Sequence, residues 1–553
     1  MNSLLIKGAT LVDGSGGAAC PADVLMAEGR ILAVGRGNSS LPADKVVDAA
    51  GLVLAPGFID IHSHTDMTLF RYPLVESKAF QGVTLEVTGN CGLSFFPVAA
   101  GGERQLAEYL ALHDFCQPAG GIAWNDLASW SEAVERPGMG INVAPLVGHA
   151  SLRIAAMGME SRPPTPGELE QMQVTLKIAL QQGAWGMSTG LIYPPGSYAD
   201  RDELIALART LADHGALYTS HIRSEGEGLA AALEEAMAIG RESGVRVQIS
   251  HLKAMGRSNR GHAGEILKKI AAARATGLDI AADQYPYAAS ATTLAALVPQ
   301  WAHEGGASSL LLRLQAPELR AQLTAEIDSA MAAREGAAGI MISNCRSGQN
   351  RHFSGKTIAE IADRWGCNGA AAVIRLLVEE KGEVGAIFFS MAEEDVVAIL
   401  ADPAVMVGSD GHGLNAGDAS GEATHPRSYG TFTRVLGRYV RDENLLSLEA
   451  AIHKMTGLPA SRLGLSDRGL VREGYVADLV LFNPATVRDQ ADYADPHRYA
   501  TGIVHLFVAG EPVIWDGKLT GRRPGRVLRR LSSKKENTFR FEQAIAKGES
   551  NVP

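Results

Sequence analysis

The distribution of apolar residues divides the chain into regions of two kinds. Near both ends, short apolar runs are separated by glycine-containing turns, a pattern typical of antiparallel strands. Such runs lie at 4–7, 9–12, 24–26, 31–35, 477–482 and 504–514. Because a long stretch with a different pattern separates the two sets, we expect residues 1–55 and 466–530 to form one small β-sandwich built from both chain ends.

Between residues 56 and 465, apolar runs alternate with amphipathic helical stretches, which is typical of parallel strands joined by helices. Eight runs qualify as strands, the number that a (β/α)8 barrel of the TIM type needs. They lie at 58–62, 84–88, 142–147, 186–189, 217–221, 246–251, 280–283 and 405–410. The predicted fold class is therefore α/β, a (β/α)8 TIM-type barrel with a small β-sandwich beside it.

Two segments of the chain belong neither to the minimal barrel nor to the sandwich. Residues from about 292 to 350 separate the seventh and eighth strands, which is too long for an ordinary connection. They contain an amphipathic helix and glycine-rich turns, and we expect this insertion to lie over the strand ends as a lid. The last residues, 531–553, are expected to form a charged tail.

Composition narrows the class of protein. The 553-residue chain has a formal net charge of -10, which argues against a nucleic-acid partner. No stretch approaches the ~18 apolar residues of a membrane span, and the N-terminus lacks the pattern of a signal peptide. The five cysteines are scattered and odd in number, which favours a reducing compartment. We expect a cytoplasmic protein; the sequence leaves its oligomeric state open.

Side chains able to bind a metal stand at several predicted strand ends, where TIM-barrel enzymes carry their catalytic residues. These side chains are His62, His64, Cys91, His149, His221, His251 and Asp410. Any one of them could be a core or turn residue. Their number at equivalent positions favours a site for a divalent metal ion.

The same positions lie within longer motifs. The chain contains Phe-Ile-Asp-Ile-His-Ser-His-Thr-Asp at 58–66, Thr-Gly-Asn-Cys-Gly at 88–92, Ser-Thr-Gly-Leu-Ile-Tyr-Pro-Pro-Gly at 188–196, Ser-His-Leu-Lys at 250–253 and His-Pro-Arg-Ser-Tyr-Gly-Thr-Phe at 425–432. With these motifs the chain resembles the amidohydrolase superfamily, and within it the N-acyl-D-amino-acid deacylases, or D-aminoacylases. The His-x-His pair indicates only the superfamily, whereas the cysteine and the 188–196 motif narrow it to the deacylases.

The resemblance implies a zinc enzyme that hydrolyses N-acyl-D-amino acids to a carboxylate and a free D-amino acid. Many amidohydrolases bridge two metals with a carboxylated lysine on the fourth strand, but residues 187–189 offer no lysine. The deacylases use a cysteine instead. The residues expected to hold one zinc tightly are Cys91, His221 and His251.

The remaining candidates are assigned to a second, weaker metal site and to proton transfer. His62, His64 and Asp410 define the second site by the same resemblance. Asp410 is also the expected general base, which takes a proton from the metal-activated water and later delivers it to the leaving amine.

Substrate recognition requires cations for the carboxylate of the amino acid. By the resemblance, Lys253, Tyr285 and Arg427 bind that carboxylate. The family's carboxylate-binding serine aligns with Ala291, so the neighbouring Ser290 is the candidate. Two more residues, Tyr193 and His149, are expected to face the pocket as carbonyl or substrate contacts.

Three alternatives stay open at this point. A deacylase of acidic N-acyl-D-amino acids would need one more cation, which Arg223 or an arginine of the insertion could supply. A cyclic-amide amidohydrolase is disfavoured because Cys91 replaces the bridging lysine. A metal-free scaffold protein is disfavoured because every expected ligand is present. We expect a preference for neutral D-amino acids and a small-molecule substrate as the partner.

Overall fold

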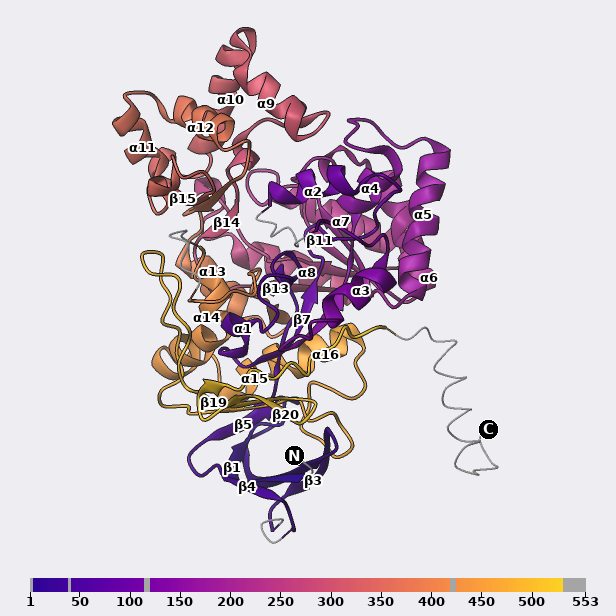
Figure 1. Cartoon of the computed structure of the whole chain (residues 1–553), viewed down its shortest axis with the longest axis vertical. Coiled ribbons are helices and arrows are strands. Elements are labelled where there is room, and N and C mark those ends of the chain that lie inside the picture. The colour runs from indigo at the N-terminus through magenta and orange to yellow at the C-terminus, as the bar shows by residue number, and fades with distance from the viewer. Residues whose placement is uncertain (1–2, 38–40, 114–119, 418–423, 531–553) are drawn as a thin grey trace.

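The computed structural model describes residues 3–37, 41–113, 120–417 and 424–530. The chain is arranged with a sheet of terminal strands at one end, parallel strands and their helices in the middle, and a separate inserted unit at the other end (Figure 1). The predicted α/β class is confirmed. The charged tail expected at 531–553 lies outside the described residues.

Strands from both ends of the chain meet in one sheet. Strand β18 pairs antiparallel with β5, and the order is β21-β20-β19-β18-β5-β1-β2-β3, with β4 beside β1. The strands are β1 (Ser3–Leu11), β2 (Cys20–Ala27), β3 (Arg30–Gly35), β4 (Lys45–Asp48), β5 (Val53–Pro56), β18 (Leu479–Phe482), β19 (Ile503–Val508), β20 (Glu511–Trp515) and β21 (Lys518–Leu519). Alternating residues of β1 and β2 bury their side chains with Leu479, Leu481 and Phe507, so the two chain ends share one apolar core.

Outside the inserted unit, the strands in the middle of the chain are parallel. One sheet has the order β6-β7-β8 and the other β17-β13-β12-β11-β10-β9. The strands are β6 (Phe58–Asp60), β7 (Val83–Thr88), β8 (Asn142–Pro145), β9 (Val147–Gly148), β10 (Gly186–Gly190), β11 (Leu217–His221), β12 (Arg246–Ile249), β13 (Ile280–Gln284) and β17 (Val405–Val407). Because parallel strands run in one direction, their carboxyl ends all face the same side of the molecule.

The two parallel sheets adjoin at both edges. Only Leu146 separates β8 from β9. At the other edge Ser63 forms a parallel bridge with Gly411, and the Asp410 amide donates to the His62 carbonyl at 2.8 Å. The predicted ligands on either side of this edge are therefore held by backbone hydrogen bonds.

Helices pack around these strands, and several begin with a capping side chain. Asp126, Thr165 and Asp200 each accept a hydrogen bond from a backbone amide in the first turn, which satisfies a donor that the helix leaves free. The helices are α1 (Glu76–Ala79), α2 (Glu103–Ala111), α3 (Leu127–Glu135), α4 (His149–Met157), α5 (Pro166–Gln181), α6 (Arg201–Asp213), α7 (Leu229–Ser243), α8 (Ala263–Ala275), α13 (Glu393–Ala401), α14 (Arg427–Arg434), α15 (Leu448–Met455) and α16 (Gly457–Leu463).

The inserted unit between β13 and β17 is longer than the predicted 292–350. Its antiparallel sheet has the order β14-β16-β15, so the last strand is the central one and the unit ends near residue 388. Its elements are β14 (Ser290–Thr293), α9 (Ala307–Gln315), α10 (Arg320–Ala332), β15 (Ile340–Cys345), α11 (Ile358–Trp365), α12 (Gly369–Glu379) and β16 (Val384–Phe388). These elements enclose an apolar core of their own, from Leu294 to Phe388.

Residues 522–530 leave the terminal sheet to which they were assigned and lie against the parallel strands. The Leu528 amide donates to the carbonyl of Val143 in β8, and the Arg530 amide donates to Gly183 just before β10. Trp185 also donates from its indole to the Leu528 carbonyl at 2.6 Å. This segment therefore fills the gap between the amino ends of β8 and β10.

Candidate active site

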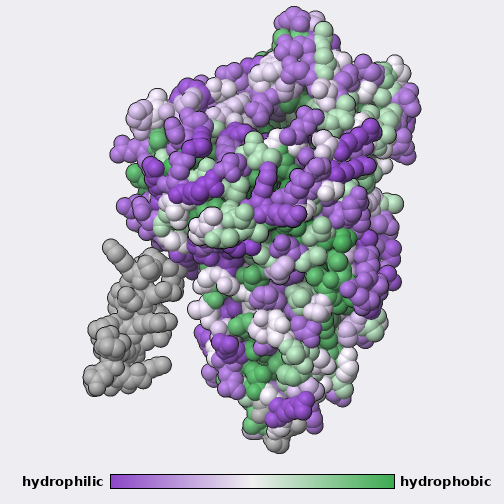
Figure 2. Space-filling view, turned by 180° about the vertical axis from the view of Figure 1, so that it is seen from behind, coloured by the Kyte–Doolittle hydropathy of each residue, from purple (hydrophilic) through white to green (hydrophobic). Residues whose placement is uncertain are grey.

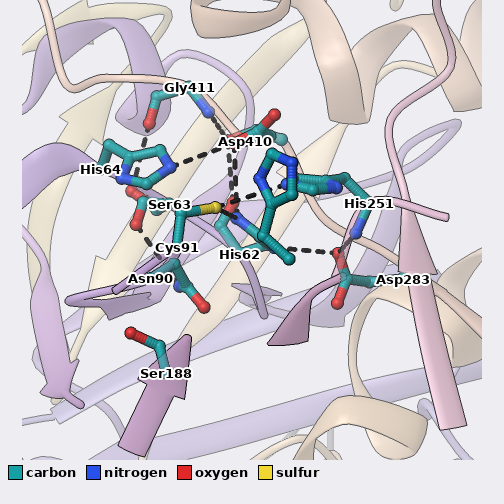
Figure 3. Close-up of polar contacts among 12 residues, drawn as sticks. His62, Ser63, His64, Asn90, Cys91, Ser188, His251, Asp283, Asp410 and Gly411 are labelled. Carbon is teal, nitrogen blue, oxygen red and sulfur yellow. Dashed lines mark hydrogen bonds and ion pairs between the residues drawn. The ribbon is translucent and has the colours of Figure 1, made fainter. Parts of the chain in front are cut away.

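Figure 3 shows five of the predicted metal ligands converging at the carboxyl ends of the parallel strands: His62, His64, Cys91, His251 and Asp410. Ligand atoms of His62, Cys91, His251 and Asp410 all lie within 4.8 Å of one another. The Cys91 sulfur lies 3.4 Å from His62 Nε2 and 3.3 Å from His251 Nε2. His64 Nε2 lies 3.1 Å from Asp410 Oδ1.

A second group of possible ligand atoms, from His221, Glu225 and His251, adjoins the first. His251 belongs to both groups. His221 is buried, yet within the described part of the chain neither of its ring nitrogens has a hydrogen-bond partner. Buried polar atoms are rarely left unpaired in this way. Together with the thiol, imidazole and carboxylate donors around them, these nitrogens fit a bound zinc ion.

The backbone holds three of these residues in an uncommon conformation. The φ angles are +54° at Cys91, +35° at His251 and +52° at Asp410. Residues with a Cβ rarely adopt positive φ, and each such residue costs of order 1–3 kcal/mol. The surrounding structure must offset this cost, which is usual where side chains have to be aimed at a common point.

Hydrogen bonds to Asp283, on the side away from the cluster, fix the orientation of His62 and the backbone of His251. Asp283 Oδ1 lies 3.1 Å from His62 Nδ1 and accepts the His251 amide at 2.8 Å. Gln248 donates to the other oxygen of Asp283 at 2.8 Å. Because Asp283 engages Nδ1 of His62, the Nε2 atom of that ring is directed at the cluster. Carboxylates behind metal-binding histidines commonly fix the ring orientation in this way.

The charges at the site favour ionised ligands. Burial alone would raise the pKa of the Cys91 thiol, but nearby His251 and His62 outweigh it and hold that pKa well below its usual value. Burial would also raise the pKa of Asp410, but Arg427 and His251 hold it well below the ordinary range. Both shifts favour the ionised forms, a thiolate at Cys91 and a carboxylate at Asp410.

The predicted carboxylate-binding residues line the same cavity and already have partners. Arg427 Nη1 donates to Asp410 Oδ2 at 2.5 Å, and Lys253 Nζ donates to Glu225 Oε1 at 2.6 Å. Both cations also lie near the ring of Tyr285, at 4.9 Å for Arg427 and 5.4 Å for Lys253. The buried Tyr285 hydroxyl has no hydrogen-bond partner among the described residues, so it is free for a ligand.

Ser290 and Tyr193 also line this cavity, as expected, whereas His149 does not. The Tyr193 hydroxyl bonds to Thr292 at 2.8 Å, and its ring packs edge-on against His221. His149 is fully buried at the start of α4, where its Nε2 lies 2.7 Å from Glu203 on α6. The expectation that His149 faces the pocket is wrong, because the ring turns inward to this carboxylate.

Sequence reasoning assigned no role to a group of buried charges behind the site. The Lys78 ammonium lies 2.8 Å from both Asp60 and Glu86, and it donates to Ser409 at 2.6 Å. Asp60 in turn accepts the amides of His62 at 3.2 Å and Ser409 at 2.8 Å. The group thus anchors the backbone beside two predicted ligands, His62 and Asp410.

Glu225 was also missed, although it lies within a motif four residues after His221. Its carboxylate contacts Lys253 and lies 3.1 Å from His251 Nδ1. Burial would raise the pKa of Glu225, but Lys253, His221 and His251 together lower it. The signal in the sequence was the spacing from His221, which places an acid one short loop beyond the strand end.

Comparisons with known proteins agree with this site. A model of the amidohydrolase family matches residues 45–514. The N-acyl-D-aspartate deacylase of Alcaligenes xylosoxydans xylosoxydans is 40% identical over 526 residues, 95% of this chain and 94% of that protein. The D-aminoacylase of the same organism is 39% identical over 96% of this chain and 98% of that protein.

A solved structure is similar over nearly the same length. The N-acyl-D-glutamate deacylase of Bordetella bronchiseptica, in complex with zinc and a phosphonate mimic of the tetrahedral intermediate, aligns with a TM-score of 0.81 and 38% identity. The alignment covers 95% of this chain and 99% of that one. The chain therefore belongs to the amidohydrolase family, in the branch that contains D-aminoacylase and the N-acyl-D-aspartate and N-acyl-D-glutamate deacylases. The resemblance inferred from the motifs is confirmed.

Proposed function

We propose that this protein is a zinc-dependent deacylase that hydrolyses N-acyl-D-amino acids to a carboxylic acid and a free D-amino acid. The observation that carries the proposal is the pair of buried ligand groups that share His251: one contains His62, Cys91 and Asp410, and the other contains His221 and Glu225. The relatives named above, which act on N-acyl-D-amino acids, support the substrate class.

Cys91, His221 and His251 are the residues proposed to hold zinc tightly. Their thiolate and imidazole donors match zinc and leave one position for water. His62, His64 and Asp410 are the proposed second, weaker site, since Asp410 Oδ1 lies between both rings, 3.3 Å from His62 and 3.1 Å from His64. When bound, the metal supplies a water of lowered pKa and polarises the amide carbonyl.

Asp410 performs the proton transfers. Its carboxylate accepts a proton from the attacking water and then delivers it to the leaving nitrogen. Arg427 keeps Asp410 ionised before the reaction, because its guanidinium lies against the second carboxylate oxygen. The general base is therefore present in its active form at neutral pH.

The substrate carboxylate is bound by Arg427, Lys253 and Tyr285, with Ser290 at the edge of the same pocket. Two cations and a free hydroxyl face a common space, which suits one carboxylate. Tyr193 contacts the carbonyl side, because its ring packs on His221. In this proposal the scissile amide lies between the metal ligands and the cations.

We also propose that the parallel strands form one closed (β/α)8 barrel and that the inserted unit acts as its lid. The backbone bridge between Ser63 and Gly411, the short β8–β9 interval and the position of the unit beyond the strand ends in Figure 1 support this arrangement. The same proposal makes the sheet of terminal strands the sandwich domain. A cytoplasmic location is proposed because Cys20, Cys91 and Cys367 carry free thiols.

The first experiment measures amine release from N-acetyl-D-methionine and N-acetyl-L-methionine, with zinc determined on the same sample. The proposal expects D-selective hydrolysis, about one zinc per chain held tightly, and loss of activity in Cys91→Ala and Asp410→Asn. Cys91→Ala should also lose zinc, whereas Asp410→Asn should keep the tight site. Zinc without turnover of any linear N-acyl-D-amino acid would overturn the proposed activity and favour a cyclic amide. Absence of both zinc and activity would favour the scaffold alternative.

One observation favours the acidic substrates as a second candidate. Arg223 is committed to Glu235 at 2.9 Å, but Arg334 of the inserted unit has no acidic partner in the part of the chain that the structure describes. Its guanidinium lines the active-site cavity, where it could pair with a second carboxylate. If it does, N-acetyl-D-glutamate will be hydrolysed faster than the uncharged N-acetyl-D-glutamine, and Arg334→Met will remove that difference. Equal rates in the unmodified protein would leave neutral substrates as the preferred class.

A further inference from the structure

A second cavity of about 490 Å³ adjoins the active-site cavity. It is lined by the inserted unit, by Leu112 and His113 just after α2, and by residues 192–194 after β10. Residues that line both cavities include Leu112, His113, Ile192, Tyr193 and Ala296. The volume is in the range of small-molecule sites, ~300–1,000 Å³, so the cavity can hold a sizeable part of a substrate.

The lining of this cavity is largely apolar. Its walls include Leu112, Met159, Ile192, Leu297 and Val298, together with the ring of Tyr109. Such a surface gains free energy by contact with hydrocarbon, because apolar area is removed from water. The chemistry of the walls therefore favours an alkyl or aryl group over a polar one.

Most of the polar side chains that line the cavity are neutral or paired, which is compatible with binding of an apolar group. Burial lowers the pKa of His113 to about 3 and that of His303 to about 4, so both imidazoles are neutral near pH 7. The carboxylate of Glu326 is engaged by the indole of Trp301. Arg223 is paired with Glu235. Of the charged side chains in the cavity, Arg334 at the junction is the one left without such a partner among the described residues.

The position of the cavity relative to the cations indicates which part of the substrate enters it. Lys253, Tyr285 and Arg427 line the active-site cavity but not the second one. The two cavities meet instead beside Tyr193, whose ring packs against the predicted ligand His221. In an N-acyl amino acid the carboxylate and the acyl chain are at opposite ends of the molecule. The side chain, by contrast, branches from the carbon that carries the carboxylate.

We propose that this second cavity binds the acyl chain, and that the protein prefers N-acyl-D-amino acids with medium-chain fatty-acyl groups, from hexanoyl to decanoyl, over N-acetyl ones. The inference rests on the proposed function and names its substrate more closely. The carboxylate is held by the cations near Asp410, the amide lies at the metal ligands, and the chain extends past Tyr193 between α10 and the 192–194 loop.

The test compares N-acyl-D-methionines with acetyl, butanoyl, hexanoyl, octanoyl and decanoyl groups. We expect kcat/KM to rise by about two- to fourfold for each added methylene up to octanoyl, the upper value corresponding to full burial of a CH₂ group. A parallel series keeps the acetyl group and lengthens the D-side chain. A rise in that series with no rise in the acyl series would overturn the inference, because the cavity would then hold the side chain.

A matched pair of variants locates the effect. Ala330 on α10 lines the second cavity and not the active-site cavity, whereas Ala332 on the same helix lines neither. Ala330→Phe should reduce the octanoyl-to-acetyl ratio of kcat/KM at least tenfold, and Ala332→Phe should leave it unchanged. An unchanged ratio in Ala330→Phe would overturn the inference. The ratio is internal to each variant, so partial loss of folded protein does not alter it.

Failure of the inference and failure of the proposed function give different results. Turnover of N-acetyl-D-methionine with no dependence on acyl length contradicts the inference alone. Absence of turnover for every member of both series contradicts the proposed function, and the inference falls with it.

Discussion

At the scale of single residues, the site is built by charges that compensate one another in the interior. Asp410 faces Arg427, Glu225 faces Lys253, and the Lys78 ammonium is enclosed by carboxylates. An unpaired charge at any of these positions would cost several kcal/mol, because water is excluded. The predicted metal ligands therefore depend on the buried charges that surround them.

Lys78 provides the clearest test of that dependence. Its side chain is fully buried between Asp60 and Glu86, so Lys78→Met leaves two carboxylates without their cation. We expect the free energy of unfolding to fall by about 3–5 kcal/mol, the usual cost of breaking a buried pair. Urea denaturation of the two proteins at pH 7 measures this difference.

The control for Lys78 is an exposed pair on the inserted unit. Lys356 and Glu360 lie 3.4 Å apart with about half of each side chain exposed, so Lys356→Met should cost less than ~1 kcal/mol. A loss in Lys78→Met as small as that of the control would mean that the buried carboxylates are protonated or solvated without Lys78. The anchoring role beside His62 and Asp410 would then be wrong.

At the scale of elements, the position of each helix start or strand end decides which side chains reach the site. His149 is the first residue of α4 and resembles a ligand in sequence, because it follows a short strand. In the folded protein the His149 ring contacts Glu203 of α6 and does not reach the cavity. Glu203 also pairs with Arg153 of α4. The three side chains join two helices that cover the strands.

We therefore predict that His149 contributes to stability and not to substrate binding. His149→Ala should lower the free energy of unfolding by at least ~2 kcal/mol, because a buried hydrogen bond to a charged group is lost. The value of KM for an N-acyl-D-methionine should change less than twofold. Tyr193→Phe is the contrasting variant, since Tyr193 lines the cavity: kcat/KM should fall, while loss of the neutral hydrogen bond to Thr292 should cost only about 1 kcal/mol. The opposite result for the two variants would return His149 to the list of substrate contacts.

At the scale of the whole molecule, the pattern of apolar runs was sufficient to predict the α/β fold class. It was not sufficient to predict how distant segments of the chain pack together. The strands were found because each is a short buried run that ends in a polar residue. The role of residues 522–530 was missed because they directly follow the terminal strands, whereas their partners, Val143 and Gly183, are distant in sequence. The end of the inserted unit was missed because β16 follows two helices and is recognised only by its pairing.

The same limit applies to the site. Cys91 and the histidines could be predicted because each stands at a strand end, whatever its neighbours are. Glu225 and Lys253 meet only because β11 and β12 lie side by side, so no local spacing shows their contact. Contacts of this kind depend on strand order, and the sequence determines strand order through the packing of the whole chain.

The outer surface differs from the interior in the expected way. Polar residues cover much of the face shown in Figure 2, with apolar residues scattered between them. None of the helices in the described part of the chain is long and apolar enough to cross a membrane. The charged groups that matter most for stability are the few that lie in the interior. Because burial shifts their pKa values, the free energy of unfolding depends on pH.

Lys454 on α15 gives the last prediction. Burial lowers the pKa of this lysine to about 8, and its ammonium donates to the Asp402 carbonyl. In the unfolded chain the pKa is near 10.5, so between about pH 8 and 10.5 the unfolded state binds more protons than the folded one. The free energy of unfolding contributed by this group therefore rises with pH through that window, and below pH 8 the charged lysine destabilises the fold by its full cost. Lys454→Met removes the cost, and at 1.36 kcal/mol for each pKa unit the variant should be more stable at pH 7 by at most roughly 3 kcal/mol.

Urea denaturation of both proteins at pH 7, 8, 9 and 10 should show this stability advantage of the variant shrinking as pH rises. An advantage that stays constant across the series would mean that Lys454 keeps its ordinary pKa in the folded protein, and that its burial is compensated by contacts other than the Asp402 carbonyl.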